Sequence, residues 1–224
     1  MKIQISDNII KHYLHNVYFI NGHSYAGKST MVKMLAERYD MVFCGENYHD
    51  VFPRNELCRW KQPALSYFDT MSSWEEWLNM SPAEHWQWTH NCSQECIEIE
   101  ITELIRLAAS DKKVIVDTNI PPDVLWEISD YHHTAIMLCD PPDICVTRFF
   151  DRADQDKKFM MEQIKLCKDP DETLNNFNSW AKYQPPNDID WEHTGFFTYT
   201  RTDFENDTRE EMLATLATHF GLGY

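Results

Sequence analysis

The residue types best suited to chemistry lie near the start of the chain, in the segment Gly22-His23-Ser24-Tyr25-Ala26-Gly27-Lys28-Ser29-Thr30. Two glycines separated by four positions and followed directly by lysine and serine make the pattern G-x-x-x-x-G-K-[ST]. The glycines allow backbone conformations that side chains forbid, so successive N–H groups can point at phosphate oxygens. Lys28 is then placed to reach the β and γ phosphates, and the Ser29 hydroxyl to ligate Mg²⁺. The segment therefore predicts a loop that binds phosphate groups together with Mg²⁺.

This pattern has meaning only where a strand precedes it and a helix follows it. Residues 17–20 (VYFI) form a short apolar run rich in strand-forming residues, as a buried parallel strand would. Residues 29–39 contain no glycine or proline and place Val32, Leu35 and Ala36 at helical spacing. Both flanks fit, and the positive end of the helix dipole would add to the attraction for phosphate.

Four further apolar runs have the length and composition of strands, at 41–44, 114–116, 135–138 and 196–199. Helical stretches separate these runs, which is typical of a parallel sheet with helices on both faces. We therefore expect an α/β fold, with one three-layer domain over residues 1–224 built on a mainly parallel, five-stranded sheet.

The segment between the second and third expected strands has roughly 70 residues, far more than one crossover helix requires. Ser81, Pro82 and Glu84 form the pattern of a capping box and predict the start of a long helix. We interpret residues 46–110 as a helical cap over the carboxyl edge of the sheet, where ligands bind in open α/β sheets. Five aromatic residues of this segment either stack on a bound ring or form a hydrophobic cluster that supports the cap. They are Trp60, Tyr67, Phe68, Trp74 and Trp77.

A phosphate loop needs a carboxylate at the end of a neighbouring strand to hold Mg²⁺, directly or through a water molecule. Asp117 closes the apolar run VIVD and is placed for that role. Asp140 also ends an expected strand, but the two prolines that follow it favour a turn. Asp117 is therefore the predicted carboxylate, with a simple turn-capping role as its alternative.

The overall charge limits the partners of the chain. Its 20 basic and 36 acidic side chains leave a net charge of −16, which repels nucleic-acid backbones and makes nucleic acid an unfavourable main partner. No segment approaches the roughly 18 apolar residues of a membrane helix, and no signal peptide is recognisable at the N-terminus. Seven cysteines at irregular spacings form no disulfide framework, which favours a reducing, cytoplasmic location.

The sequence resembles the P-loop small-molecule kinases, which include nucleoside monophosphate, shikimate and gluconate kinases. The resemblance lies in GHSYAGKST at 22–30, VIVD at 114–117 and RFFDR at 148–152. It implies the P-loop NTPase fold and transfer of the γ-phosphoryl group of ATP, with Mg²⁺, to a small-molecule hydroxyl or phosphate acceptor. The segment DTNIPP at 117–122 departs from the glycine-rich strand end of shikimate kinases, which counts against shikimate as the acceptor.

The resemblance also implies roles for two arginines. Arg148 would stack on adenine, and Arg152 would reach the transferring phosphate from a lid over residues 148–185. Fixed cations at this point would neutralise the charge of the transferring group. The alternative for Arg152 is a surface ion pair with a neighbouring aspartate.

In these kinases the second strand delivers residues to the acceptor. Here it is followed by Glu46, Asn47, His49 and Asp50. A carboxylate near the acceptor hydroxyl would orient it or take its proton, and Asp50 is the first candidate and Glu46 the second. Both acids would otherwise be solvated loop residues.

A local basic cluster follows this segment. Arg54, Arg59 and Lys61 lie within eight residues of an otherwise acidic chain. They either clamp an anionic acceptor, such as a nucleoside monophosphate, or offset nearby acids at the surface.

Two functions remain open from the sequence: a kinase, and a non-catalytic module that senses ATP or ADP with a degenerate acceptor site. Turnover that depends on an acceptor would distinguish them. A GTPase switch is disfavoured, because no glycine has aspartate three residues before it and no N-K-x-D segment occurs.

Overall fold

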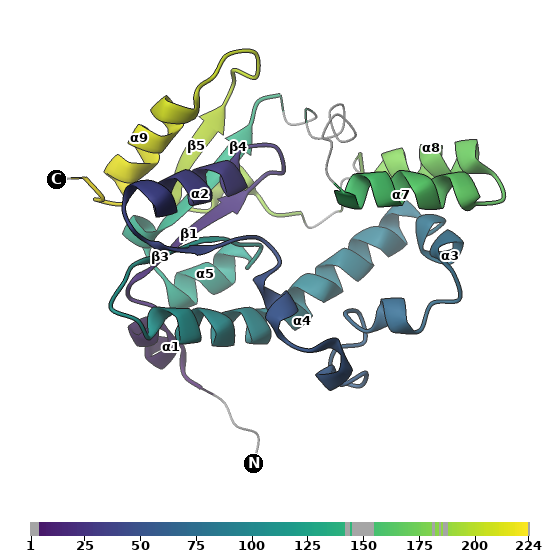
Figure 1. Cartoon of the computed structure of the whole chain (residues 1–224), viewed down its shortest axis with the longest axis horizontal. Helices are drawn as coiled ribbons and strands as arrows, with labels where there is room; N and C mark the ends of the chain where they lie inside the picture. Colours follow the sequence, from purple (N-terminus) through teal and green to yellow (C-terminus); the bar gives the residue numbers. More distant parts are fainter. Residues whose placement is uncertain are drawn as a thin grey trace. The chain divides into compact units, whose positions relative to one another are not determined.

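A computed structural model describes residues 5–141, 144, 155–180, 182–183, 185 and 188–223 (Figure 1). The chain divides into two compact units. The first unit comprises Met1–Phe52, Ile97–Pro142 and Asp190–Tyr224, and the second comprises Pro53–Cys96 and Asp143–Ile189. The predicted cap over 46–110 has residues in both units, and its role, like that of a lid over 148–185, stays a prediction.

The first unit is built on a sheet of five strands in the order β2-β3-β1-β4-β5. The strands are β1 (Val17–Gly22), β2 (Val42–Cys44), β3 (Val114–Asp117), β4 (Thr134–Cys139) and β5 (Phe197–Arg201). Every neighbouring pair is parallel. The five expected strands and the α/β class are confirmed, and each strand lies within two residues of the range expected from its apolar run.

The central strand β1 positions the candidate loop. It lies between β3 and β4, with Ile20 paired to Asp117 and Gly22 paired to Met137. The chain leaves β1 toward β2 on one side of the sheet and later returns to β4 on the other, which makes the end of β1 a topological switch point. Since all strands are parallel, the segment after Gly22 and the side chain of Asp117 lie at the same carboxyl edge.

Helices cover both faces of this sheet (Figure 1). One face packs on α1 (Asp7–Tyr13), α5 (Pro122–Ile128) and the last turns of α4 (Pro82–Ala108). The other carries α2 (Lys28–Arg38) and α9 (Arg209–His219), which contact each other. The predicted helix over 29–39 is confirmed in α2.

Side-chain alternation along the strands divides the core in two. Phe19, Val116 and Ile136 belong to the cluster on the α1, α4 and α5 side. Ile20, Ile115 and the other alternate residues are also buried and point to the α2 side. Short 3₁₀ helices complete the first unit: η1 (Tyr48–Val51), η4 (Tyr131–His133) and η6 (Trp191–His193).

The second unit is helical. It contains η2 (Arg54–Glu56), η3 (Tyr67–Asp69), α3 (Trp74–Leu78), the first part of α4, α7 (Gln155–Leu166) and α8 (Pro170–Trp180). The predicted capping box is confirmed: the Ser81 N–H donates to Glu84 at 2.8 Å, and the Glu84 N–H donates to the Ser81 hydroxyl at 3.3 Å.

Aromatic side chains form the core of the second unit. The ring of Trp77 lies edge-on to Trp74, Trp88 and Trp180, at centroid distances of 5.9, 5.5 and 5.1 Å. The interpretation of the tryptophans as a hydrophobic cluster is therefore confirmed for Trp74 and Trp77. Trp60 differs, because 92% of its surface is exposed.

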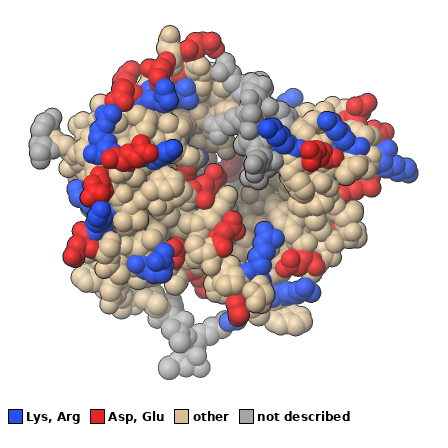
Figure 2. All heavy atoms as spheres, viewed as in Figure 1, with Lys and Arg blue, Asp and Glu red and all other residues tan. Residues whose placement is uncertain are grey.

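Within the described part of the chain, no helix combines the length and apolar character needed to span a bilayer. On the face shown in Figure 2, acidic side chains are interspersed among the basic ones, with no continuous basic area over the described residues.

Candidate functional site

The loop after β1 depends on glycine at both ends. Gly22 has φ +121° and Gly27 has φ +98°, conformations that L side chains rarely adopt. A Cβ atom at Gly22 would lie 2.1 Å from the carbonyl oxygen of Met137 on β4. The next residue, His23, donates its N–H to this same oxygen at 2.9 Å. The loop is therefore held against β4 at a distance that only glycine permits.

Helix α2 begins directly after this loop, with Gly27 as its N-cap. The Met31 N–H donates to the Gly27 carbonyl at 3.0 Å. The N–H groups of Lys28, Ser29 and Thr30 precede this bond and have no acceptor within the helix. Such a helix end attracts anions through its N–H groups and its dipole.

Lys28 points back over the loop. Its side chain is largely buried, with 8% of the residue exposed, and its ammonium group donates to the carbonyl of His23 at 3.2 Å. A lysine in this position carries positive charge to the interior of the loop rather than to the solvent. This is the geometry that the sequence pattern predicts for a phosphate-binding lysine.

Asp117 and Ser29 meet at the carboxyl edge of the sheet. The Ser29 hydroxyl donates to Oδ2 of Asp117 at 2.6 Å. Asp117 is 1% exposed, and its Oδ1 has no hydrogen-bond partner among the described residues. Burial raises the pKa of Asp117, and the charge of Glu46 adds to this rise, while Lys28 and Ser29 oppose it.

This pair fits a magnesium ion. Mg²⁺ prefers oxygen ligands and binds through one or two carboxylates, water and phosphates. The Ser29 hydroxyl would supply one oxygen, and the unpartnered Oδ1 of Asp117 would supply another, directly or through water. Burial disfavours the ionised form of the Asp117 carboxyl group, and a bound cation would favour that form. Asp140, the rival candidate, is exposed at the end of β4.

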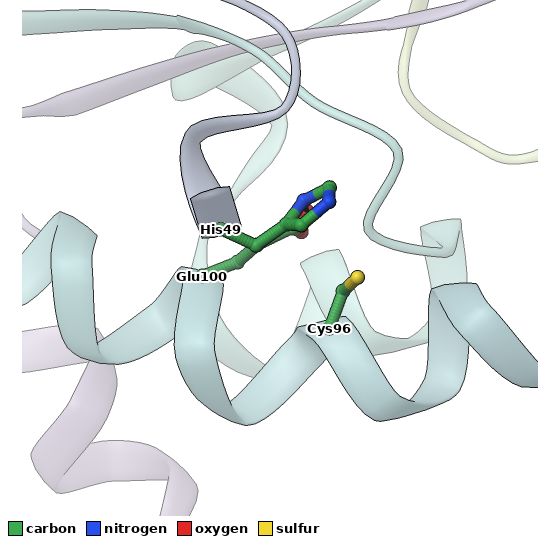
Figure 3. A group of neighbouring side chains, drawn as sticks. All are labelled: His49, Cys96 and Glu100. Carbon is green, nitrogen blue, oxygen red and sulfur yellow. Dashed lines mark hydrogen bonds and ion pairs between the residues drawn. The ribbon is translucent and has the colours of Figure 1, made fainter. Parts of the chain in front are cut away.

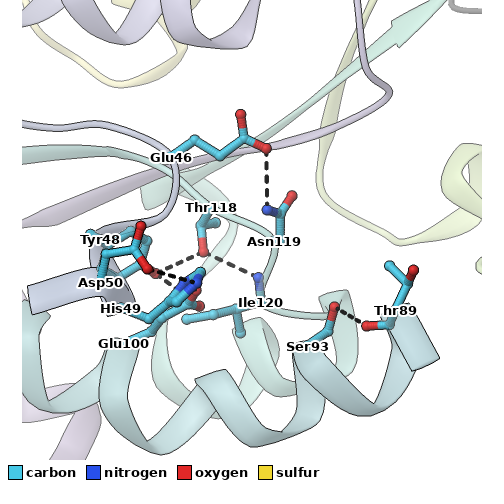
Figure 4. A network of polar contacts seen from close by, with 10 residues as sticks. All are labelled: Glu46, Tyr48, His49, Asp50, Thr89, Ser93, Glu100, Thr118, Asn119 and Ile120. Carbon is cyan, nitrogen blue, oxygen red and sulfur yellow. Dashed lines mark hydrogen bonds and ion pairs between the residues drawn. The ribbon is translucent and has the colours of Figure 1, made fainter. Parts of the chain in front are cut away.

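Glu46, one of the two acids predicted to face an acceptor, acts on Asp117 electrostatically. It is exposed in the turn after β2 and accepts a hydrogen bond of 3.4 Å from the side chain of Asn119, two residues after Asp117 (Figure 4). Its charge contributes to the raised pKa of Asp117.

Asp50, the first candidate from the sequence, lies in η1. Its side chain is 70% exposed, and its nearest described cationic partner is His49, with Oδ1 3.9 Å from Nε2. Of these two acids, Glu46 is the one whose charge adds to the raised pKa of Asp117.

A buried polar network lies next to these acids (Figure 4). Glu100 of α4 is 4% exposed and accepts from His49 Nδ1–H at 3.1 Å and from the Tyr48 hydroxyl at 3.3 Å. The Tyr48 hydroxyl also bonds the Thr118 hydroxyl at 2.9 Å, and Thr118 accepts from the N–H of Ile120 at 3.1 Å. The network joins α4 to the residues that follow β3.

The network sets the protonation of two side chains. The hydrogen bond to Glu100 raises the pKa of His49, and the charges of Glu100, Asp50 and Glu46 act in the same direction against partial burial. Burial raises the pKa of Tyr48 well above its usual value, so its hydroxyl stays a donor.

Sequence reasoning missed Glu100, which appeared as one more acid on a helix. Figure 3 shows His49 directed at Glu100, with Cys96 one turn earlier on α4. The nearest donor atoms of these three residues all lie within 4.8 Å of one another, a spacing that allows a small cation. The hydrogen bond between His49 and Glu100 already accounts for the arrangement of those two side chains.

Arg201 is a second residue that sequence reasoning missed. It ends β5, and its guanidinium Nη1 donates to the carbonyl of Tyr25 in the loop at 3.5 Å, while Nε donates to the carbonyl of Asp203 at 3.1 Å. The available signal was a basic residue directly after an apolar strand, at the carboxyl edge where the loop lies.

The remaining predicted residues divide into two groups. Arg148 and Arg152 lie outside the described residues, and their roles stay predictions. Arg54 and Arg59 are exposed in the second unit, and the clamp on an anionic acceptor also stays a prediction.

In comparisons with known proteins, no family model, no curated protein and no solved structure matches this chain. Membership of the P-loop kinases accordingly stays an expectation from the motifs at 22–30, 114–117 and 148–152.

Proposed function

We propose that this protein is a P-loop kinase that transfers the γ-phosphoryl group of ATP, with Mg²⁺, to a small-molecule hydroxyl or phosphate acceptor. One observation carries the proposal. The Ser29 hydroxyl bonds a buried, half-satisfied Asp117 at the N-terminus of a helix that a glycine loop and a buried lysine introduce. A structural turn has no need for this combination of oxygen ligands, a buried lysine and N–H groups without an acceptor in the helix.

In this proposal, different residues of the chain bind the phosphates of ATP and the Mg²⁺ ion. The N–H groups of Lys28, Ser29 and Thr30 at the start of α2 bind and orient the phosphate oxygens, and the Lys28 side chain contacts the β and γ phosphates. Ser29 and Asp117 hold Mg²⁺, which when bound neutralises charge between the phosphates. Phosphoryl transfer depends mainly on such positioning and electrostatic stabilisation, so fixed cations in a preformed loop account for most of the rate.

Glu46 is the residue that orients the acceptor hydroxyl in this proposal. It extends from the turn after β2, and its charge acts on Asp117, which holds the metal. A hydroxyl hydrogen-bonded to Glu46 would therefore lie near the transferring phosphate. Asp50, with a side chain that is 70% exposed, is the alternative. The predicted roles of Arg148 and Arg152, of the cap and of the lid complete the proposal. The predicted clamp of Arg54 and Arg59 applies only to an anionic acceptor.

The test is ADP release from Mg-ATP across a panel of acceptors, with the Lys28→Ala protein as the blank. The panel holds nucleosides, nucleoside monophosphates, sugar acids, amino sugars and aminoglycosides. An acceptor that raises ADP release well above the blank establishes a kinase and names its substrate class. ATP binding without acceptor-dependent release would instead favour the non-catalytic nucleotide sensor.

A further inference from the structure

His49 lies in the segment predicted to face the acceptor, and a hydrogen bond to a buried partner, Glu100, fixes the orientation of its ring. Its Nδ1 lies 3.1 Å from Oε1 of Glu100, and 22% of its side chain is exposed against 5% for Glu100. An ionised carboxylate only accepts hydrogen bonds, so the proton of the neutral imidazole stays on Nδ1. The ring therefore presents Nε2 away from α4.

Glu100 is itself held in place. The Tyr48 hydroxyl donates to its second oxygen at 3.3 Å, and Thr118 bonds that hydroxyl at 2.9 Å. Both carboxylate oxygens of Glu100 thus have a donor. A buried carboxylate with its partners in place is costly to move, which makes the His49 ring a preorganised group rather than a mobile surface side chain.

The groups around the exposed edge of His49 are acidic. Asp50 lies 3.9 Å from Nε2, and Glu46 is close enough to influence the charge of His49. Tyr48 and Glu100 lie behind the ring, and Cys96 lies one turn before Glu100 on α4. Among the described residues of the first unit, no lysine or arginine forms an ion pair or hydrogen bond with Glu46, His49 or Asp50.

We propose that His49, held by Glu100, is an acceptor-binding residue whose Nε2 bonds a polar group of the acceptor, and that the acceptor is an uncharged or cationic alcohol rather than a phosphate ester. This inference rests on the proposed function and narrows its substrate class. Glu46 contacts the reacting hydroxyl, and His49 contacts a second hydroxyl. An additional phosphate that bound beside Glu46 and Asp50 would meet two like charges, which is unfavourable.

Glu100 is a positioning residue that acts through His49, and α4 offers a matched control for it. Glu103 lies on the same helix, is 7% exposed and pairs with Arg106 at 2.5 Å. Glu100→Gln and Glu103→Gln therefore make the same chemical change at two buried positions, of which only the first contacts His49.

The first experiment measures binding without turnover. The ring nitrogen resonances of His49 are followed by NMR in the protein loaded with Mg-ADP, while adenosine, AMP, glucosamine, glucosamine 6-phosphate and kanamycin are added in turn. We expect the unphosphorylated compounds that bind to shift Nε2, and the Nδ1 proton of His49 to be present in both the neutral and the charged form of the ring. A preference for the phosphate esters, or binding that leaves His49 unchanged, overturns the proposal.

The second experiment measures kinetics with an acceptor that the panel identifies. His49→Leu should raise the KM for the acceptor about tenfold, the equivalent of one hydrogen bond, and leave the KM for ATP within about twofold. His49→Gln, which retains a polar group, should recover part of this loss. Glu100→Gln should raise the acceptor KM and shift the pH profile of kcat/KM, and Glu103→Gln should do neither.

Different results would overturn the role of His49 and the proposed kinase activity. Equal effects of Glu100→Gln and Glu103→Gln, or an unchanged acceptor KM in His49→Leu, overturn the role of His49 while Lys28-dependent turnover still establishes the kinase. Absence of turnover with every acceptor, together with equal release by Lys28→Ala, overturns the proposed function and this inference with it.

Discussion

The hydroxyl of Ser29 donates a 2.6 Å hydrogen bond to the carboxylate of Asp117, 88 positions further along the chain. The sheet brings these residues together, because β3 pairs directly with β1 and places Asp117 beside Ile20. Helix α2 begins only a few residues after Ile20, at the same edge. Two short sequence motifs therefore form one site through a single pair of parallel strands.

Asp117→Asn should separate the metal function of this pair from its structural role. The amide oxygen still accepts from Ser29, but the amide carries no charge for Mg²⁺. We expect turnover to fall by about tenfold to a hundredfold, the range found for residues that support a metal site. Titration of activity against Mg²⁺ should show that the variant needs a higher Mg²⁺ concentration for half-maximal turnover.

The same variant should change the pH dependence of stability. The raised pKa of Asp117 means that the folded state holds its proton above the ordinary value of 3.8. Wild-type stability should therefore fall as pH rises from that value through the raised pKa, and Asp117→Asn should lack this fall. Asp140→Asn, an exposed change at the end of β4, is the control. Equal loss of activity in Asp140→Asn would contradict the assignment of Asp117.

Lys28→Ala should abolish turnover and leave the fold intact. The ammonium group contacts the His23 carbonyl within the loop, so its removal takes away the cation without opening the core. Lys33→Ala is the matched control, since Lys33 is exposed on the same helix. Circular dichroism and ADP release measured on both variants test this prediction, and normal turnover in Lys28→Ala would refute the phosphate loop.

Gly22→Ala should destabilise the protein by about 3 kcal/mol or more, because a side chain there is strained and meets the backbone of β4. Gly221→Ala isolates the clash. Gly221 also has positive φ, +61°, but a Cβ atom there meets nothing within 4 Å. We expect only about 1 kcal/mol for the control. Urea unfolding of the two variants gives both values, and similar losses would show that the contact with Met137 is unimportant.

The sequence predicted those elements that depend on local patterns. The five strands are short apolar runs, α2 follows a glycine loop, and the capping box at Ser81 and Glu84 is a signal of four residues. Parallel pairing then places the ends of the strands at one edge, which is why Asp117 was identified without any knowledge of strand order.

The sequence did not predict features that depend on which helix face meets which loop. Glu100 lies among several glutamates of α4, and only the packing of this helix beneath η1 distinguishes it as the partner of His49. Arg201 is similar, because its contact with Tyr25 requires the position of β5 at the edge of the sheet. The preference for Glu46 over Asp50 also depends on the fold. Asn119 donates a hydrogen bond to Glu46, and the charge of Glu46 adds to the raised pKa of Asp117.

Glu46→Gln and Asp50→Asn should have unequal effects on catalysis. Glu46 acts on Asp117 and bonds Asn119, whereas the Asp50 side chain is 70% exposed. We expect Glu46→Gln to lower kcat by about a hundredfold, as for loss of a group that orients or deprotonates the nucleophile, and Asp50→Asn to lower it less than about fivefold. Steady-state kinetics of both variants provide the measurement. A larger loss in Asp50→Asn would restore the order that the sequence favoured.

The pair of His49 and Glu100 should make stability depend on pH near neutrality. The folded pKa of His49 is raised above its ordinary value of 6.5, chiefly by the hydrogen bond to Glu100. The resulting stabilisation is fully present below the ordinary pKa and is lost as pH rises through the folded pKa. The difference in unfolding free energy between wild type and Glu100→Gln should therefore be largest at about pH 5.5 and smaller at about pH 8.5.

For Glu103→Gln the difference in unfolding free energy from wild type should stay constant over this pH range, because its partner Arg106 stays charged throughout. Urea unfolding at several pH values measures both differences, and a flat result for Glu100→Gln would mean that His49 is not held as an ion pair.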